Sequence, residues 1–151
     1  MNITSLFQIK REQNKQIVID KNLNQYKVSA RKHLELHIKL GSLAEQTQCY
    51  KYWLDDISKP NKEIIFEKYL DCLGQVLTIG IDSDYSDIEE IKVLPNDYCL
   101  SDQFLNLYID INDLIISPSK DHYQTLLEDF ISLGITLGYS ENKIIESFIS
   151  K

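Results

Sequence analysis

Two pairs of side chains have the i, i+4 spacing that places both members on one face of a helix. His33 and His37 have the spacing of two imidazole ligands of one metal ion. The glutamate of a His-Glu-x-x-His motif is absent, so we interpret them as partly exposed histidines. Glu67 and Asp71 have the spacing of two carboxylate ligands of one divalent cation, although isolated acidic pairs are usually surface features.

A group of acidic residues resembles the start of a calcium-binding loop. The residues concerned are Asp82, Asp84 and Asp87, and the first two have the spacing of loop positions one and three. Loop position six would then be Asp87, where glycine is required, and position twelve would be Val93, where glutamate is required. We therefore interpret this segment as a solvated acidic loop.

Aromatic side chains gather around one lysine after the first third of the chain. Tyr50, Tyr52 and Trp53 lie next to Lys51, a combination that can stack a nucleobase and hold a phosphate. The residues by themselves favour a different interpretation, namely a helix end whose aromatic rings are packed in the core.

The cysteines and the N-terminal residues bear on the cellular compartment. Cys49, Cys72 and Cys99 form an odd set without C-x-x-C spacing, which is typical of reduced cytosolic thiols. A cysteine-histidine nucleophile is not indicated, because spacing does not show that the two residue types meet. No secretion signal and no apolar run of membrane-spanning length is present. We expect a cytoplasmic protein without a membrane partner.

The composition fits one domain, residues 1–151. The chain has 151 residues, with 16 Lys plus Arg, 23 Asp plus Glu and a formal net charge of −7. This acidic balance argues against a nucleic-acid partner or an anionic membrane, because both require clustered cations. Five Gly and three Pro leave little room for a glycine-rich phosphate loop or a turn-rich β-sandwich.

Apolar residues repeat at steps of three and four along most of the chain, which predicts helices. The third of these helices is apolar on more than one side, so we expect it to be central. The predicted helices run from a capping box at Ser5 to about Asp20, from about Ser29 to Leu54, from Asn61 to a C-cap at Gly80, from about Ser101 to Ile115, from about Ser119 to Leu137, and from Ser140 onward. Between them, residues 82–99 are predicted to form a loop with a short extended piece at Ile91 to Leu94. The predicted fold class is all-α, a bundle of about five to six helices.

Several segments carry a resemblance to a known family. LELHIKLGSLAEQTQCYKYW, residues 34–53, and FEKYLDCLGQVLTIGID, residues 66–82, resemble the all-α dimeric dUTP diphosphatases of bacteria and their phages, in the MazG-like NTP pyrophosphohydrolase group. The similarity extends to LFQIKREQNKQIV, residues 6–18, and to LGITLGYSENKIIESFISK at the C-terminus. It covers most of the chain apart from residues 83 to about 120, and it implies the all-α NTP pyrophosphohydrolase fold.

The resemblance implies hydrolysis of dUTP to dUMP and pyrophosphate at a magnesium ion held by carboxylates of two helices. The Glu-x-x-Glu positions fall on Lys39 and Ser42, and the Glu-x-x-Asp positions fall on Lys68 and Asp71. These four side chains carry one net positive charge in place of four negative ones. Magnesium keeps its waters unless several carboxylates attract it, so we expect no metal cofactor. An ion pair between Lys39 and Asp71 is expected in its place.

The nucleotide-binding positions implied by the resemblance are partly retained. Uracil contacts of the first helix fall on Asn14, which suits the family pattern, and on Lys10, where glutamine is usual. Lys51 and Trp53 match the Phe-Lys-x-Trp element of the family, which meets the nucleotide. We expect Asn14, Lys51 and Trp53 to be vestigial substrate-binding residues.

Two further parts of the family site are altered. Gly74 and Gln75 stand where histidine and phenylalanine commonly enclose the base. Relatives continue past the Phe-Ile-Ser-Lys segment with Asn and Arg residues that bind phosphates, whereas this sequence ends at Lys151. With the carboxylates, three parts of the site depart from the family.

The residues and the resemblance leave three functional hypotheses open. The first is a dUTP-diphosphatase-like protein without magnesium-dependent hydrolysis, which senses dUTP or dUMP or contacts a regulatory protein partner. The second is an active dUTP or NTP pyrophosphohydrolase whose magnesium site is rebuilt from Glu67, Asp71 and either Glu35 or Glu45. The third is a helical interaction module with no nucleotide ligand. The resemblance also implies a homodimer, and apolar surface on the third and fifth predicted helices is consistent with one.

Overall fold

The computed structural model describes residues 1–54 and 59–151. Helices dominate this part of the chain, so the all-α prediction is confirmed. They are α1 (Thr4–Asn14), α2 (Gln25–Thr47), α3 (Lys62–Asp82), α4 (Leu100–Ile116), α5 (Lys120–Thr136) and α6 (Glu141–Ile149). In these same ranges the β pairing consists of one isolated bridge, between Asn2 and Glu90. The extended piece predicted at Ile91 to Leu94 therefore forms no strand.

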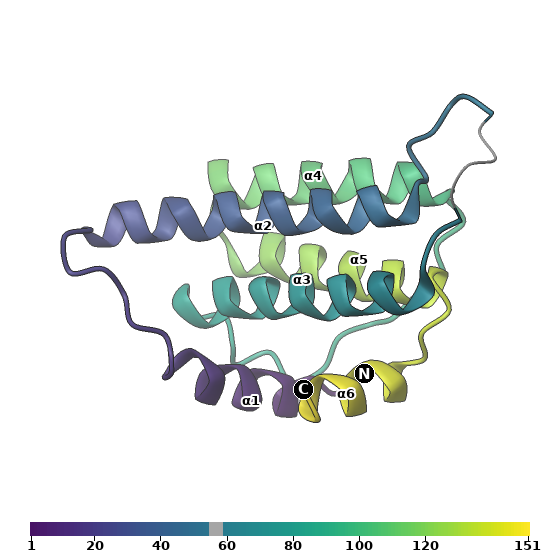
Figure 1. Ribbon diagram of the computed structural model, residues 1–151. Coiled ribbons are helices and arrows are strands. Elements are labelled where there is room, and N and C mark those ends of the chain that lie inside the picture. The colour runs from purple at the N-terminus through teal and green to yellow at the C-terminus, as the bar shows by residue number, and fades with distance from the viewer. Residues whose placement is uncertain (55–58) are drawn as a thin grey trace.

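The helices pack as three layers of two (Figure 1). The first layer holds α2 and α4, the central layer holds α3 and α5, and the third holds α1 and α6. The two chain ends lie close together where α1 meets α6. Helix α3 contacts α1, α2, α5 and α6, so the prediction that it is the central helix is confirmed.

Two predicted helix boundaries are wrong because local capping decides them. Helix α2 begins earlier than Ser29, since the Asn24 side chain accepts a hydrogen bond from Lys27 N at 2.8 Å. It ends at Thr47 instead of Leu54, where Gln48 adopts a left-handed conformation with φ of 57°. Because Gln48 is neither glycine nor asparagine, the sequence pattern gives no indication of this end.

The first helix also differs from its prediction. It ends at Asn14, well before Asp20, and its N-cap residue Ile3 makes no side-chain capping bond, so the capping box at Ser5 does not form. Instead, the Asn2 side chain accepts a hydrogen bond from Thr4 N at 3.0 Å. The segment before the helix is also fixed by the bridge to Glu90, and long-range pairing of this kind is not visible in local sequence.

Other predicted helix ends are confirmed. The side chains of Asn61, Ser119 and Ser140 accept hydrogen bonds from the first turns of α3, α5 and α6. Gly138 follows α5 with φ of 99°, a conformation that favours glycine.

Two tyrosines join α3 to α5 in a reciprocal arrangement. Tyr123 of α5 donates to Val76 O at 2.9 Å, and its ring covers Gly80, where an added Cβ would lie less than 3.0 Å from the phenol. Tyr69 of α3 donates to Phe130 O at 3.0 Å and covers Gly134 of α5 in the same manner. Gly80 was predicted to cap α3, but the helix continues to Asp82. The glycine is explained instead by the Tyr123 ring, which leaves no room for a side chain there.

Large apolar side chains remain exposed on α2 and α4. The sequence had predicted such exposed apolar surface on the third and fifth helices instead. Leu34 and Ile38 of α2, and Leu105 and Ile109 of α4, are each more than half exposed. The apolar residues of α3 and α5 are mostly buried because the other helices cover them. In the described ranges, no helix combines the length and the hydropathy that crossing a membrane would require.

Candidate functional site

A cavity of about 500 Å³ lies among α1, α2 and α3. Its charged lining is mainly basic and comes from Lys10, Arg11, Lys15, Lys32 and Lys39. Two carboxylates, Glu35 and Asp82, also line it, so the cavity walls carry three net positive charges with the lysines protonated. Its size is in the range of cavities that bind small molecules.

Lys39 holds two carboxylates at the side of this cavity. Its Nζ lies 3.0 Å from Glu35 Oε2 on α2 and 3.1 Å from Asp71 Oδ1 on α3. The ion pair predicted between Lys39 and Asp71 is therefore present. Burial alone would lower the pKa of Lys39, but the hydrogen bonds to Glu35 and Asp71 outweigh burial and raise it.

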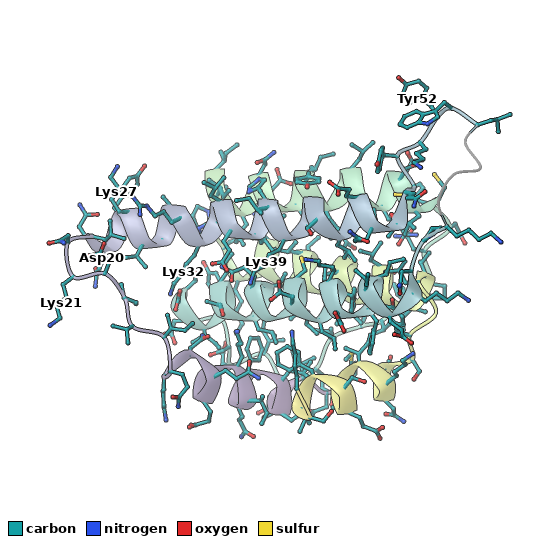
Figure 2. All side chains as sticks on the ribbon, viewed as in Figure 1. Asp20, Lys21, Lys27, Lys32, Lys39 and Tyr52 are labelled. Atoms are coloured by element: carbon teal, nitrogen blue, oxygen red, sulfur yellow. The ribbon has the colours of Figure 1, made fainter. Side chains whose placement is uncertain are left out.

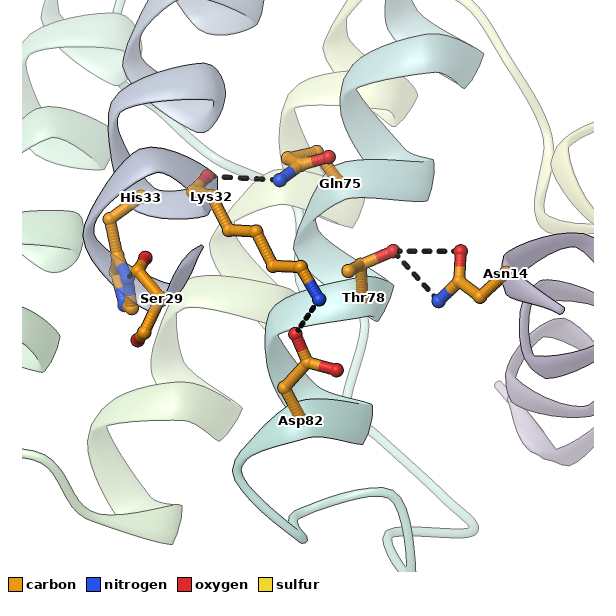
Figure 3. A network of polar contacts seen from close by, with 7 residues as sticks. All are labelled: Asn14, Ser29, Lys32, His33, Gln75, Thr78 and Asp82. Atoms are coloured by element: carbon orange, nitrogen blue, oxygen red, sulfur yellow. Dashed lines mark hydrogen bonds and ion pairs between the residues drawn. The ribbon is translucent and has the colours of Figure 1, made fainter. Parts of the chain in front are cut away.

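A set of hydrogen bonds connects the three helices around the cavity (Figure 3). Lys32 Nζ of α2 lies 2.6 Å from Asp82 Oδ2 of α3, and Gln75 Nε2 donates to Lys32 O at 2.9 Å. On the other side, Asn14 Nδ2 of α1 donates to Thr78 Oγ1 at 3.3 Å. Asn14 and Gln75 thus lie in one cavity, and Gln75 holds α2 against α3.

Lys10 differs from the other cavity lysines because its side chain makes no hydrogen bond or ion pair within residues 1–54 and 59–151. Its Nζ and Cε lie over Gly74, 3.4 and 3.6 Å from the point where a Cβ would stand. Burial is the main factor that lowers the pKa of Lys10, and the charges of Lys39 and Lys151 lower it further. The sequence indicated a lysine at a position where the family usually has glutamine. That this lysine has no ion-pair partner in the described residues is seen only in the structure.

The remaining predicted ligand positions do not line the cavity. Ser42 and Lys68 lie one turn away from Lys39 and Asp71 on their helices, and both are half-buried. Figure 2 shows Lys32 and Lys39 between α2 and α3, whereas Tyr52 lies on the loop beyond the other end of α2. Within one chain, this loop is therefore remote from the cavity.

The aromatic loop is exposed. Tyr52 is 93% exposed and Trp53 is 46% exposed, so the interpretation that these rings are packed in the core is wrong. The helix ends at Thr47, before these aromatics, and they lie beyond its packed faces. Lys51 Nζ lies 6.0 Å from the centroid of the Trp53 ring, and the structure does not bring either residue together with Asn14.

Of the four acidic residues of the rebuilt-site hypothesis, only Glu35 and Asp71 come together in the described part of the chain, and they meet at Lys39. Glu45 and Glu67 are exposed, whereas Glu35 and Asp71 are both bound to Lys39. Where the structure describes the chain, it contains no group of three or more His, Cys, Asp or Glu side chains arranged to hold a metal ion.

The acidic loop is partly neutralised by lysines from two helices. Asp82 is bound to Lys32, and Asp87 Oδ2 lies 2.8 Å from Lys120 Nζ. The hydrogen bond from Lys120 lowers the pKa of Asp87. These side chains serve as ion-pair partners, in agreement with the interpretation of a surface loop.

The paired histidines are occupied by backbone contacts. His33 Nδ1 lies 2.8 Å from Ser29 O, and His37 Nδ1 lies 2.9 Å from His33 O. The His37 ring also packs against Tyr108 of α4, with the ring centroids 5.8 Å apart. These contacts support the interpretation of the two histidines as ordinary helix-surface residues.

A buried carboxyl group between α4 and α5 was not found by sequence reasoning. Asp110 is 8% exposed, and its Oδ2 has no hydrogen-bond partner among residues 1–54 and 59–151. Burial, followed by the hydrogen bond and charge of Asp129, raises the pKa of Asp110 to about 8. Asp129 Oδ2 also accepts a hydrogen bond from Asn106 Nδ2 at 3.1 Å. This carboxyl pair lies on α4 and α5, and neither helix contributes a residue to the lining of the cavity.

A comparison with known families identifies the whole domain. The sequence profile of the family described as dUTPase matches residues 2–151. The chain belongs to the dUTPase family. This match includes the segment between 83 and about 120 that the initial resemblance omitted. No curated protein and no solved structure matches the chain significantly.

The dUTPase family implies a magnesium ion, and the residues at the four ligand positions decide whether this chain can hold one. Of the four positions assigned to the metal ligands, Asp71 is the one carboxylate, and its Oδ1 already contacts the Lys39 ammonium. An ammonium group at 3.1 Å from the carboxylate occupies and neutralises the side of Asp71 that a cation would use. The residues present therefore do not fit magnesium.

Proposed function

We propose that this dUTPase-family protein has lost magnesium-dependent hydrolysis of dUTP and acts by binding. The contact of Lys39 with both Glu35 and Asp71 is the observation that carries the proposal. Magnesium in such a site neutralises the triphosphate and activates the attacking water. A lysine supplies charge but no bound water, so hydrolysis loses its nucleophile.

The hydrolysis assay compares this protein with an active all-α dUTP diphosphatase. Both proteins are incubated with dUTP and Mg²⁺, and the release of pyrophosphate is followed. We expect no release above the uncatalysed background from this protein. Turnover near that of the active enzyme would overturn the proposal and would support the rebuilt-site hypothesis, in which magnesium is the cofactor.

We also propose that the protein forms a homodimer through α2 and α4. Members of the family are typically oligomeric, and these helices carry the exposed residues Leu34, Ile38, Leu105 and Ile109. Leu34 also lines a groove of about 460 Å³ together with Ile115, which supports the view that the two helices present one apolar surface. A patch of this kind is typical of an interface with a second copy.

Sedimentation of the wild type and of Ile38→Glu tests the dimer. We expect the wild type to sediment as a dimer at micromolar concentration and the variant to sediment as a monomer, because a charge in an apolar interface is costly. A monomeric wild type would contradict the proposal. Lys27→Glu is the control, since it places the same charged group at an exposed position of the same helix.

The binding role leaves a nucleotide or a regulatory protein as partner, and a cytoplasmic location is part of the same proposal. Three free cysteines support a reducing compartment. Between the two classes of partner, the basic cavity favours a nucleotide.

A further inference from the structure

A second cavity, of about 470 Å³, lies between residues 92–98 and one face of α5. Helices α4 and α5 pack side by side behind α2 and α3, and residues 92–98 lead into α4 (Figure 1). The helix side of this cavity consists of Thr125, Glu128, Asp129 and Ser132, which have the i, i+3, i+4, i+7 spacing of one helical face. None of these four residues lines the cavity among α1, α2 and α3.

The segment that covers this face is fixed to α5 by two hydrogen bonds. Lys92 N donates to Glu128 Oε2 at 2.8 Å, and Ser132 Oγ donates to Leu94 O at 2.8 Å. Because the covering segment is held at these points, the cavity is largely pre-formed, as ligand sites usually are.

The charged lining of this cavity is mainly acidic. Asp97, Glu128 and Asp129 contribute carboxylates and Lys92 contributes an ammonium group, so the walls carry two net negative charges when all four are ionised. Lys92 and Asp97 are exposed, whereas Glu128 and Asp129 are half-buried. Charges act more strongly where solvent is partly excluded, so the acidic character is greatest on the helix side.

A buried carboxyl group extends this acidic surface into the interior. Asp110 of α4 is 8% exposed, and its Oδ2 has no hydrogen-bond partner in residues 1–54 and 59–151. Its carboxyl group lies beside that of Asp129, which lines the cavity. Asn106 Nδ2 donates one hydrogen bond to Asp129 Oδ2, at 3.1 Å. Two neighbouring carboxyl groups, one of them buried with an oxygen that has no donor, favour a cation beside them.

The other groups of the cavity indicate an organic cation. Tyr98, which is 65% exposed, supplies an aromatic ring, and Leu94 supplies apolar surface. Within the described ranges, the carboxylates do not form a group of three arranged around one metal ion. A guanidinium group matches this combination, because its planar fork binds a carboxylate with two hydrogen bonds and stacks on aromatic faces.

We propose that this cavity binds a guanidinium cation, which Asp129 and Glu128 hold by hydrogen bonds and the Tyr98 ring covers on one face. The guanidinium group belongs either to a small molecule or to an arginine side chain of a protein, and the chemistry of recognition is the same in both. The inference is independent of the function proposed above, since the two cavities share no lining residue.

Binding should be linked to the release of a proton from the carboxyl pair. Burial, followed by the hydrogen bond and charge of Asp129 and the charge of Asp113, raises the pKa of Asp110 to about 8. A cation beside Asp129 favours the ionised form of Asp110 and lowers this pKa, so the affinity should rise with pH up to about 8. On α2, which also packs against α4, His37 is a titratable side chain in contact with α4, at Tyr108.

Titrations followed by the amide chemical shifts in NMR spectra test the proposal with three compounds. N-acetyl-L-argininamide carries the guanidinium group, N-acetyl-L-citrullinamide has nearly the same shape without the charge, and methylguanidine is the free cation.

The wild type is compared with Asp129→Asn, which removes the charge and keeps an oxygen that can accept from Asn106. Asp121→Asn is the matched control, because Asp121 is exposed on the same helix and does not line the cavity. Circular dichroism of each variant verifies that it is folded.

We expect N-acetyl-L-argininamide to shift the signals of residues 92–98 and 125–132 and to bind about tenfold or more tightly than the citrulline compound, because charge-assisted hydrogen bonds are made. Asp129→Asn should weaken this binding by about tenfold or more, whereas Asp121→Asn should bind as the wild type does. Asp110→Asn should lose the rise in affinity between about pH 6 and 8, since it retains His37 but lacks the titrating carboxyl group.

Equal affinities for the arginine and citrulline compounds would overturn the proposal, and so would equal affinities of Asp129→Asn and the wild type. Absence of binding, or shifts confined to residues outside the cavity, would overturn it as well. Methylguanidine distinguishes the two sources of the cation. If it binds as tightly as N-acetyl-L-argininamide, the guanidinium group is the whole ligand and a small molecule is supported. If it binds more weakly, peptide atoms add to the affinity and an arginine of a protein is supported.

Discussion

Substitution of Gly80 by alanine tests the contact between the two central helices. A Cβ at this position would lie less than 3.0 Å from Oη and Cζ of Tyr123, a side chain with no exposed surface. Real Cβ atoms essentially never approach other atoms this closely, so the phenol must move and release Val76 O, which accepts its hydrogen bond at 2.9 Å.

The cost of this change follows from its parts. Overpacking of a core costs about 1–3 kcal/mol. Leaving the buried hydroxyl without its partner costs about 1–3 kcal/mol more. Alanine recovers about 1 kcal/mol because glycine is unfavourable within a helix. We therefore expect Gly80→Ala to lower the free energy of unfolding by about 2–4 kcal/mol, taking the middle of these ranges.

Urea denaturation followed by circular dichroism measures this loss. The midpoint should fall in Gly80→Ala with little change in the slope, since the surface exposed on unfolding is the same. Gly74→Ala is the matched control on α3, because its Cβ would meet the flexible Lys10 side chain at an ordinary distance of 3.4 Å. We expect it to be neutral or slightly stabilising. Equal stability of the two variants would refute the role assigned to Tyr123.

Three further predictions concern charged and reactive groups. The pKa of Asp110 is higher in the folded state than in the unfolded state. As the pH rises from the ordinary pKa of 3.8 to about 8, the free energy of unfolding therefore falls by up to about 1.4 kcal/mol per pH unit. Asp110→Asn should lack this contribution. Denaturation of both proteins across this pH range measures the difference, and an identical pH dependence of the free energy of unfolding would contradict the prediction. Lys39→Met should cost less than about 1 kcal/mol, because its ion pairs are partly exposed. Thermal melts at low and high salt measure this loss, and a much larger value would indicate a fully desolvated pair. Ellman's reagent should modify the exposed Cys99 in the native protein and reach Cys72 only after denaturation, since Cys72 is buried and burial raises its pKa. Rapid native labelling of Cys72 would show that α3 is less protected than described.

The sequence predicted features that depend on local interactions. The caps at Asn61, Ser119 and Ser140 and the turn at Gly138 were recognisable because each depends on a few neighbouring residues. The ends of α1 and α2 were not, since they depend on the bridge to Glu90 and on a left-handed Gln48. The role of Gly80 required knowledge of a tyrosine on another helix.

The candidate site was predictable in part for the same reason. The pairing of Lys39 with Asp71 followed from aligning two family motifs, which brings distant residues together without a structure. The exposure of Trp53 and the lack of an ion-pair partner for Lys10 within the described residues did not follow, because both depend on the path of the chain between helices. The buried Asp110 appeared in the sequence as one more acidic residue of a helix.

The tyrosine contacts between α3 and α5 determine which residues of α3 are free to vary. At about 100° per residue, Tyr69 and Gly80 lie on one side of α3, whereas Asp71, Gln75 and Thr78 lie on the other. The contacts that hold the helix in register are thus physically separate from the side chains on the cavity side. Exchanges on the cavity side leave the anchored side intact. In a fold divided in this way, substitutions that change the chemistry of the cavity leave the packing of α3 against α5 unchanged.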